Sequence, residues 1–211
     1  MSTDPFHRLV IGRRTALAAA ALGMPATARS AAPAAGPRQA GMVTAVVGTA
    51  TAEAPPAPRP LHDSAPVFLD DLLVTGPASR LAMRLGTSTL VRLGASAKLR
   101  VDRYIVNQGG ELNLESGQLL FDSADGKYPK GLMVRSDYAL IAVRGTRFWG
   151  GMLDDDFAVF VARGVVTVSA GGKSLPLGAG DGTTISHRGD PPEAVHRWPQ
   201  AKIARALALV T

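Results

Sequence analysis

The sequence predicts an all-β protein: a single domain of many short strands, arranged as a meander, a small solenoid or a sandwich, with a short C-terminal helix. Three observations support this fold class. Apolar and polar residues alternate with period two in many short segments. Turns that contain glycine separate these segments, and helical periodicity is confined to the C-terminal end of the chain.

The composition excludes several classes of function. At 211 residues the chain can bury a sizeable core, and it contains no cysteine, which excludes disulfides, thiolate metal sites and a cysteine nucleophile. Half of the formal net charge of +6 comes from the first 32 residues, and the rest is spread without a basic block. Aromatic residues make up only 5% and do not interleave with basic ones, so we expect no nucleic-acid binding.

The N-terminus has the pattern of an export signal. Arg13 and Arg14 precede a mild Ala/Leu stretch over 15–23, and Ala26 and Ala28 supply the small residues of a cleavage site. The apolar stretch is far shorter than the roughly 20 residues that span a bilayer. The paired arginines resemble a twin-arginine signal, with general secretory export as the alternative. The sequence therefore predicts a periplasmic or secreted protein.

Four parts follow one another along the chain. We expect a twin-arginine-like signal peptide at 1–28, a flexible Ala-, Pro- and Gly-rich linker at 29–40, a β domain at 41–185, and a C-terminal loop and helix at 186–211. No other segment is suited to a membrane helix, so we expect no transmembrane segment in the mature chain. The sequence does not predict an oligomeric state.

The β domain begins with strands of uneven length. Residues 42–47 form the first, a proline-rich loop follows near residues 55–60, and an apolar run over 67–75 stops at Gly76-Pro77. A repeat of eight residues comes next, with alternating segments at 81–85, 89–93 and 97–101. We expect their apolar residues to stack in two columns: Met83, Val91 and Leu99 in one, and Leu85, Leu93 and Val101 in the other.

Short strands continue through the second half. The further alternating or apolar segments are 111–115, 118–121, 132–135, 157–161, 165–168 and 174–177. Glu111 and Glu115 lie opposite the leucines of their segment, so we expect solvated carboxylates rather than an acid/base pair. Gly171-Gly172 predicts a two-residue hairpin turn. Asp154-Asp155-Asp156 predicts a solvated turn rather than a calcium loop, whose spaced oxygen ligands are missing.

The segment 141–149 is the most informative in the chain. An apolar run enters Arg144-Gly145-Thr146 and leaves as a second apolar, aromatic run that includes Phe148. A glycine inside a strand indicates a bulge, a bend or a close backbone approach. Because arginine is rarely buried without a partner, we expect Arg144 to be a brace tied to a carboxylate or to carbonyls. The alternative is that Arg144 binds a ligand.

An ordered series of motifs resembles the FecR family domain over roughly residues 42–185. The series comprises a D-x-(I/L)-x-T-G step, a glycine-led strand, a V-R-G-T-x-F core and an E-G-x-V-x-V strand. The residues of this signature, structural or binding, are Thr75, Gly76, Gly117, Arg144, Gly145, Thr146, Phe148 and Gly164. Two departures are visible. Arg163 stands where the family often has Glu, and Gly86-Thr87-Ser88 replaces the common Asp-Gly-Ser.

The resemblance implies a periplasmic sensing module. In the iron-siderophore regulators that name the family, such a region responds to an outer-membrane receptor and controls a sigma factor through an N-terminal anti-sigma segment. A signal peptide is predicted where that segment would be, so the sigma-factor mechanism is not expected to transfer. We expect a non-enzymatic binding or signalling module whose partner is an envelope protein or a glycan. An envelope scaffold is the alternative, and an enzyme the less favoured one.

The remaining polar residues suggest no catalytic, cofactor or metal site. His62, His187 and His196 have no metal-ligand spacing between them. Ser136-Asp137 and His62-Asp63 could be combined into a triad on paper, but no G-x-S-x-G turn accompanies them. We therefore expect no catalytic residue, no cofactor and no bound metal.

The C-terminus predicts the helix. Pro199 suits a first helical turn, and residues 200–210 are rich in helix formers. Ile203, Leu207 and Val210 form one apolar stripe, with Trp198 as an anchor at the entry. Because so short a helix is marginal alone, we expect it to dock on an open end or edge of the sheet. The alternative is a contact element for another protein.

Overall fold

The computed structural model describes residues 38–54, 56–105, 109–123 and 131–211. The predicted signal peptide, with Arg13, Arg14, Ala26 and Ala28, lies outside the described residues, as does the linker up to residue 37. The first strand begins at Gln39, and Ala40 is already buried.

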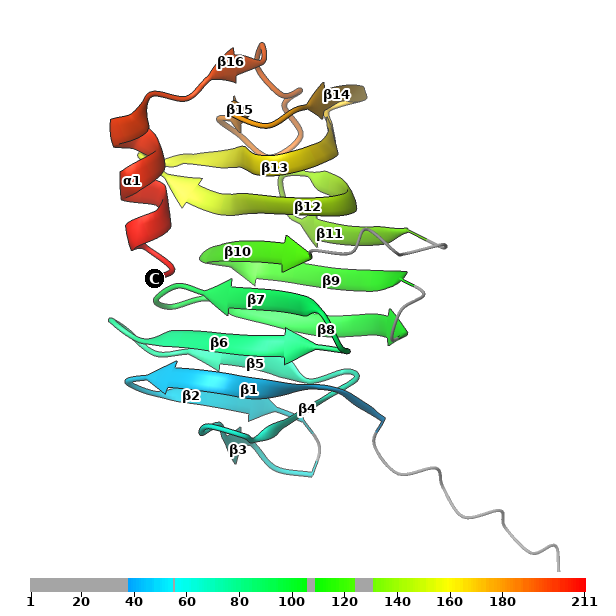
Figure 1. Ribbon diagram of the computed structural model, residues 1–211, viewed down its shortest axis with the longest axis vertical. Coiled ribbons are helices and arrows are strands. Elements are labelled where there is room, and N and C mark those ends of the chain that lie inside the picture. The colour runs from blue at the N-terminus through cyan, green and yellow to red at the C-terminus, as the bar shows by residue number, and fades with distance from the viewer. Residues whose placement is uncertain (1–37, 55, 106–108, 124–130) are drawn as a thin grey trace, which may run out of the picture. The chain divides into compact units, whose positions relative to one another are not determined.

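Sixteen strands and one helix make up the described chain (Figure 1). The strands are β1 (Gln39–Val47), β2 (Ala50–Glu53), β3 (Arg59–Pro60), β4 (Pro66–Phe68), β5 (Leu72–Thr75), β6 (Arg80–Leu85), β7 (Thr89–Leu93), β8 (Lys98–Ile105), β9 (Gly109–Ser116), β10 (Gln118–Ser123), β11 (Leu132–Ser136), β12 (Leu140–Leu153), β13 (Asp156–Ala170), β14 (Lys173–Leu177), β15 (Asp181–Ile185) and β16 (His196–Arg197). The helix is α1 (Gln200–Ala208). The all-β prediction with a C-terminal helix is therefore confirmed.

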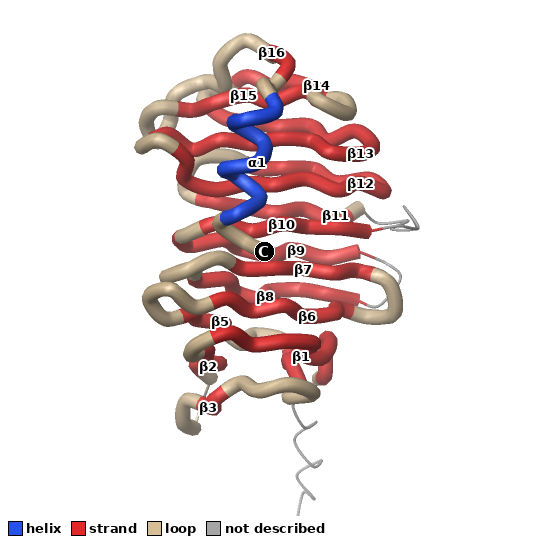
Figure 2. Tube along the Cα trace, turned by 60° about the vertical axis from the view of Figure 1, so that its left-hand side comes forward, coloured by secondary structure: helices blue, strands red, loops and turns tan. Residues whose placement is uncertain are grey.

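One long strand, β12, organises the sheet. Its first part pairs with β11, and its second part pairs with β10. The order continues from β11 through β9, β8, β5 and β2 to β3, and from β10 through β7, β6 and β1 to β4. We call these two arms the β9 layer and the β7 layer. Figures 1 and 2 show the arms stacked against each other, so a single curled sheet produces a sandwich-like arrangement.

The core lies between the two layers. One apolar cluster contains inward residues of both, such as Met83 and Phe121 from the β7 layer and Leu99 and Leu112 from the β9 layer, all fully buried. Period-two alternation puts these residues on the inner face of each strand. Burial of each large side chain contributes about 1.5–3 kcal/mol. The core therefore comes from the alternating pattern that predicted the strands.

The predicted apolar columns are only partly correct. Met83 does face Val91, but Leu85 faces Thr89, because β6 and β7 form an antiparallel hairpin that reverses the order of side chains. Leu99 lies in the β9 layer, beside Leu73 and Leu114. The connection from β7 to β8 crosses between layers, so an eight-residue spacing in sequence does not place the third segment next to the second.

The helix covers a face of the sheet rather than an end or an edge. Pro199 precedes α1 as its extended N-cap residue, and Trp198 stacks on Phe160 with ring centroids 5.2 Å apart. A second apolar cluster joins α1 to the outer side of β10, β12 and β13: Leu120, Trp149, Leu153, Ala158, Phe160, Trp198, Ala206 and Val210. Figure 2 shows α1 running across these strands. The helix docks on the β domain, as predicted, but it does so on a face of the sheet and not at an end or edge.

Two tight turns were predicted correctly. Gly171-Gly172 joins β13 to β14, with Ala170 opposite Lys173. Asp154-Asp155 joins β12 to β13, with Leu153 opposite Asp156. Asp154 also accepts two hydrogen bonds of 2.8 Å from Arg205, which ties α1 to this hairpin.

Candidate functional site

The Arg-Gly-Thr segment is a β-bulge, as the sequence predicted. Arg144 pairs with Val165 and Arg147 with Arg163, so Gly145 and Thr146 together face Gly164 on β13. Gly145 and Gly164 have φ of +62° and +82°, which glycine adopts without strain. A Cβ on Gly164 would lie 2.6 Å from the Gly145 carbonyl oxygen. The bulge is where β12 changes its partner from β11 to β10, and hence passes from one layer to the other.

Arg144 is not a buried brace, contrary to the leading prediction. Its side chain is exposed, and no hydrogen bond or ion pair joins it to the described residues. Its position on β12 explains this. Ile141 and Val143 point into the core, so Ala142 and Arg144 point to solvent on the outer side of the β9 layer. An arginine on the outer side needs no partner, because water solvates its charge.

Exposed apolar side chains surround Arg144. Val165, its direct cross-strand neighbour, is 55% exposed, and Met133, opposite Ala142, is 36% exposed. The row formed by Met133 and Ala142 continues through Thr167 on β13 and Pro176 on β14. We call this surface the Arg144 face; it consists of Met133, Ala142, Arg144, Val165, Thr167 and Pro176. A cation beside exposed apolar groups is a typical interaction surface.

Thr75 and Gly76 stabilise the turns between strands. Thr75 is buried; its hydroxyl donates to the Gly94 carbonyl over 2.6 Å and accepts from the Ala97 amide over 2.8 Å. Gly76 approaches Thr49 so closely that a Cβ would lie 2.3 Å from its hydroxyl oxygen. These two signature residues therefore have a structural role.

The other signature residues are also packed within the domain. Gly117 lies against the Ala97 backbone, and Phe148 is fully buried, with its ring centroid 5.4 Å from that of Phe121. Thr146 is fully buried, and its hydroxyl has no hydrogen-bond partner among the described residues. Of the eight signature residues, Arg144 is the one whose side chain the structure leaves in solvent.

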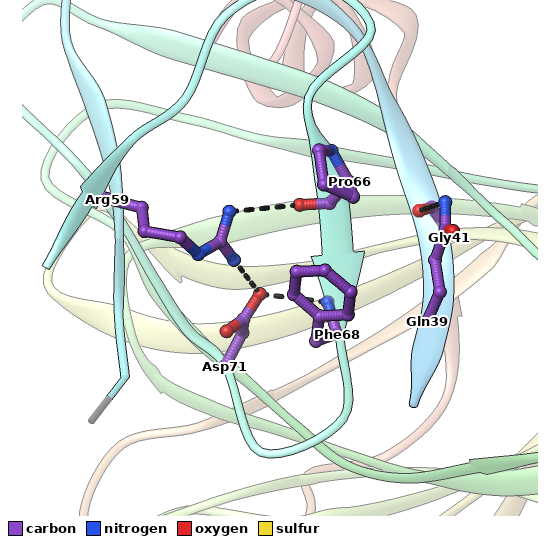
Figure 3. A network of polar contacts seen from close by, with 6 residues as sticks. All are labelled: Gln39, Gly41, Arg59, Pro66, Phe68 and Asp71. Atoms are coloured by element: carbon purple, nitrogen blue, oxygen red, sulfur yellow. Dashed lines mark hydrogen bonds and ion pairs between the residues drawn. The ribbon is translucent and has the colours of Figure 1, made fainter. Parts of the chain in front are cut away.

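Asp71 organises a polar network that the sequence analysis missed (Figure 3). Its carboxylate is 1% exposed, lies 2.6 Å from the Arg59 guanidinium, and accepts a 2.8 Å hydrogen bond from the Phe68 amide. Arg59 also donates to the Pro66 carbonyl over 3.3 Å and lies over the Phe68 ring. Because β3 and β4 end the two arms, this network joins the layers at that end of the sandwich. Its role is structural.

A small pocket lies near the turns that end β9 and β11. Tyr138 and Phe157 stack at 5.1 Å, and Arg188 lies over Tyr138 while pairing with Asp137 at 2.9 Å. The Ser136 hydroxyl accepts hydrogen bonds from the amides of its own turn. The triad considered from the sequence is not assembled, because His62 contacts the Asp63 carbonyl on a different loop.

The expected solvation is wrong for one of the two glutamates. Glu111 is buried and pairs with Arg135 at 2.6 Å, whereas Glu115 is exposed as expected and pairs with Arg100 at 3.2 Å. Glu111 does lie opposite the leucines, beside the outward Met133, as predicted, but neighbouring side chains such as Arg135 cover it there. Within the described ranges, no group of three or more His, Cys, Asp or Glu residues could hold a metal ion.

Together, these features define a class: an all-β domain with a structural signature and exposed contact surfaces. Residues 71–167 match the family model described as FecR protein. This stretch is therefore similar to the FecR domain, in agreement with the resemblance seen in the sequence.

The fold is shared with solved structures. Two crystal structures of a candidate anti-sigma factor from Parabacteroides distasonis are similar, with TM-scores of 0.53 and 0.52 and 18% sequence identity in each case. The match covers 64% of this chain in both comparisons, and 64% and 63% of the two solved chains. At this identity the likeness concerns the fold. A comparison with curated proteins finds no match. In the described part of the chain, no helix is long and apolar enough to span a membrane.

Proposed function

We propose that this protein is an exported, non-enzymatic FecR-type module that binds a protein of the bacterial cell envelope through its Arg144 face. The FecR domain supports a role in signalling. The observation that carries the proposal is Arg144 itself, a signature residue that has no hydrogen bond or ion pair with the described residues and stands in solvent beside Val165 and Met133.

The chemistry of the face favours a protein partner. Arginine beside apolar groups is enriched at the centres of protein interfaces, because its planar guanidinium binds carboxylates or carbonyls while its stem packs on apolar surface. Val165 and Met133 would be covered by such a partner. A glycan-binding protein and an envelope scaffold are the alternatives; a scaffold would need no specific contact at Arg144.

Site-specific photo-crosslinking tests the proposal. A photoreactive residue at Val165 should capture an envelope protein in intact cells, whereas the same residue at Val47, which is equally exposed at 57%, serves as the matched control. Arg144→Glu should abolish the Val165 adduct without changing expression or melting temperature. Adducts at both positions, or none at Val165, would contradict a specific interface there and favour a scaffold.

Export is a separate part of the proposal. The leader-like pattern around Arg13-Arg14 supports passage out of the cytoplasm by the twin-arginine route. A reporter fused to residues 1–40 should reach the periplasm, and Arg13→Lys with Arg14→Lys should block it. Export that survives both substitutions would indicate the general secretory route, and a reporter retained in the cytoplasm would contradict export.

A further inference from the structure

A second exposed surface lies on the outer side of the β7 layer, away from the Arg144 face. Strand pairing places one outward residue of each successive strand in a row from β1 to β13. The members of the row are Met42, Arg84, Leu90, Asp122, Arg147 and Arg163. Arg92 lies beside the row, opposite Ala82. We call this surface, with Arg92 included, the arginine row.

The arginine row is strongly cationic. Its four arginines against one aspartate leave a formal charge of +3. Asp122 is already shared, since it lies 2.8 Å from the Arg163 guanidinium and 3.8 Å from Nε of Arg147. Arg84 and Arg92 are exposed and have no hydrogen bond or ion pair with the described residues. The surface therefore has unused donors.

Apolar side chains stand between these cations. Leu90, directly between Arg84 and Asp122, is 40% exposed, and Met42 at the end of the row is 46% exposed. The helix α1 covers Leu120, Trp149 and Phe160 on the same side, but leaves the row open. A polyanionic sugar would supply charge and no apolar group for Leu90. A polypeptide can supply both.

The spacing of the row fits an extended chain. Arg84 and Arg147 are three strands apart, which is about 14 Å at roughly 4.8 Å per strand. Side chains on one side of an extended polypeptide repeat about every 6.8 Å. Carboxylates at positions i and i+4 of such a segment would therefore reach Arg84 and Arg147, with the residue between them above the junction of Leu90 and Asp122, nearer to Leu90.

We propose that the arginine row binds an extended acidic polypeptide segment whose carboxylates alternate with apolar side chains. The presence of Arg163 gives this chain a more cationic row than the resembling family often has. The glutamate that the resembling family often has at this position would stand opposite Arg147 and beside Asp122, so it would reduce the charge of the row by two. The proposal is independent of the Arg144 face, because the two surfaces lie on the outer sides of different layers.

Fluorescence anisotropy with a defined peptide tests the proposal. The probe is a labelled peptide of about twelve residues with Glu at every fourth position and Leu midway between, and its counterpart carries Gln in place of Glu. The Glu peptide should bind, and its Kd should rise with salt because the contacts are charge pairs. Arg84→Glu with Arg92→Glu should raise the Kd by at least about tenfold. Both residues are exposed, so the variant should keep its circular dichroism spectrum.

The matched control removes the same charge elsewhere. Lys98→Glu with Lys173→Glu changes two exposed cations outside the row, and should leave the Kd within about twofold. An equal loss in this control would show attraction by net charge alone and would overturn the proposal. So would equal binding of the Gln peptide, or heparin binding in the absence of Glu-peptide binding. Arg144→Glu should leave peptide binding intact; loss of binding there would overturn the separation of the two surfaces.

Discussion

Arg144 and Arg147 are three residues apart on one strand and lie on opposite sides of the molecule. Arg144 precedes the bulge, where β12 belongs to the β9 layer, and its side chain is unpaired in the described structure. Arg147 follows the bulge, where β12 belongs to the β7 layer, and lies near Asp122. A bulge can therefore direct the side chains of one sequence motif to two surfaces.

The two outer sides also differ in what covers them. On the β7 layer, α1 buries Leu120, Trp149 and Phe160. On the β9 layer, within the described ranges, Val165 and Met133 remain exposed to solvent. Large aromatic residues are therefore covered by the chain's own helix, whereas smaller apolar residues around Arg144 remain accessible to another molecule.

Removing Trp198, which anchors α1, should have the largest effect, because α1 covers the outer side of the β7 layer. Trp198→Ala should destabilise the domain by about 3–5 kcal/mol, because it empties a site packed between Trp149, Phe160 and α1. Urea denaturation gives the free energy of unfolding, and near-ultraviolet circular dichroism reports the tryptophan environment. Trp198→Phe serves as the milder control. A loss below about 1 kcal/mol would mean that α1 is dispensable for the β7 layer.

Blocking the bulge should affect both layers. Gly164→Val combines a disfavoured positive φ with a clash against the Gly145 carbonyl, so we expect a loss of about 3 kcal/mol in stability. Gly172→Val is the matched control, since its φ is also positive but no atom lies within 4 Å of the added Cβ. If the two variants melt at the same temperature, close packing at the bulge contributes nothing beyond backbone strain.

Asp122 keeps two arginines side by side on the β7 layer. Asp122→Asn removes the charge between Arg147 and Arg163, which are direct cross-strand neighbours, so we expect a loss of about 1 kcal/mol. High salt should reduce this loss by screening the repulsion. Asp154→Asn, which affects an exposed pair at a hairpin, is the comparison variant. A loss that salt does not change would argue against repulsion as its cause.

Arg144 should be nearly neutral for stability. Arg144→Ala should change the free energy of unfolding by less than about 0.5 kcal/mol, because the side chain is exposed and unpaired within the described structure. Arg135→Ala, on the same layer, should cost more, since it removes an ion pair of the buried Glu111. Thermal and urea denaturation of both variants measure this difference. A large loss for Arg144→Ala would restore the brace interpretation.

Much of the fold could be predicted from local pattern. Alternation identified most strands, and paired glycines or aspartates identified two hairpin turns, because both signals depend on neighbouring residues. The layer to which each strand belongs could not be predicted in this way. Whether Leu99 lies beside Val91 or across the core from it depends on the path of a connection, which the strand pattern does not encode.

The candidate site shows the same limit. Gly145 indicated the bulge, since a glycine weakens a regular strand and is favoured where the backbone bends. The exposure of Arg144 depends on which side of β12 faces the core, and the burial of Glu111 depends on the neighbouring β11, which brings Arg135 over it. The partner of Asp71 could not be predicted from the sequence. Arg59 lies on β3, and it reaches Asp71 only because of the path that the chain takes between the two residues.

Because β12 is hydrogen-bonded to a strand of each arm, we expect the two arms to open together. Amide protons of β7 and of β9 should therefore exchange with deuterium through a common global opening rather than through separate local events. Such a domain would transmit tension applied at one end to the other as a rigid connector, a mechanical property that originates in a single two-residue kink.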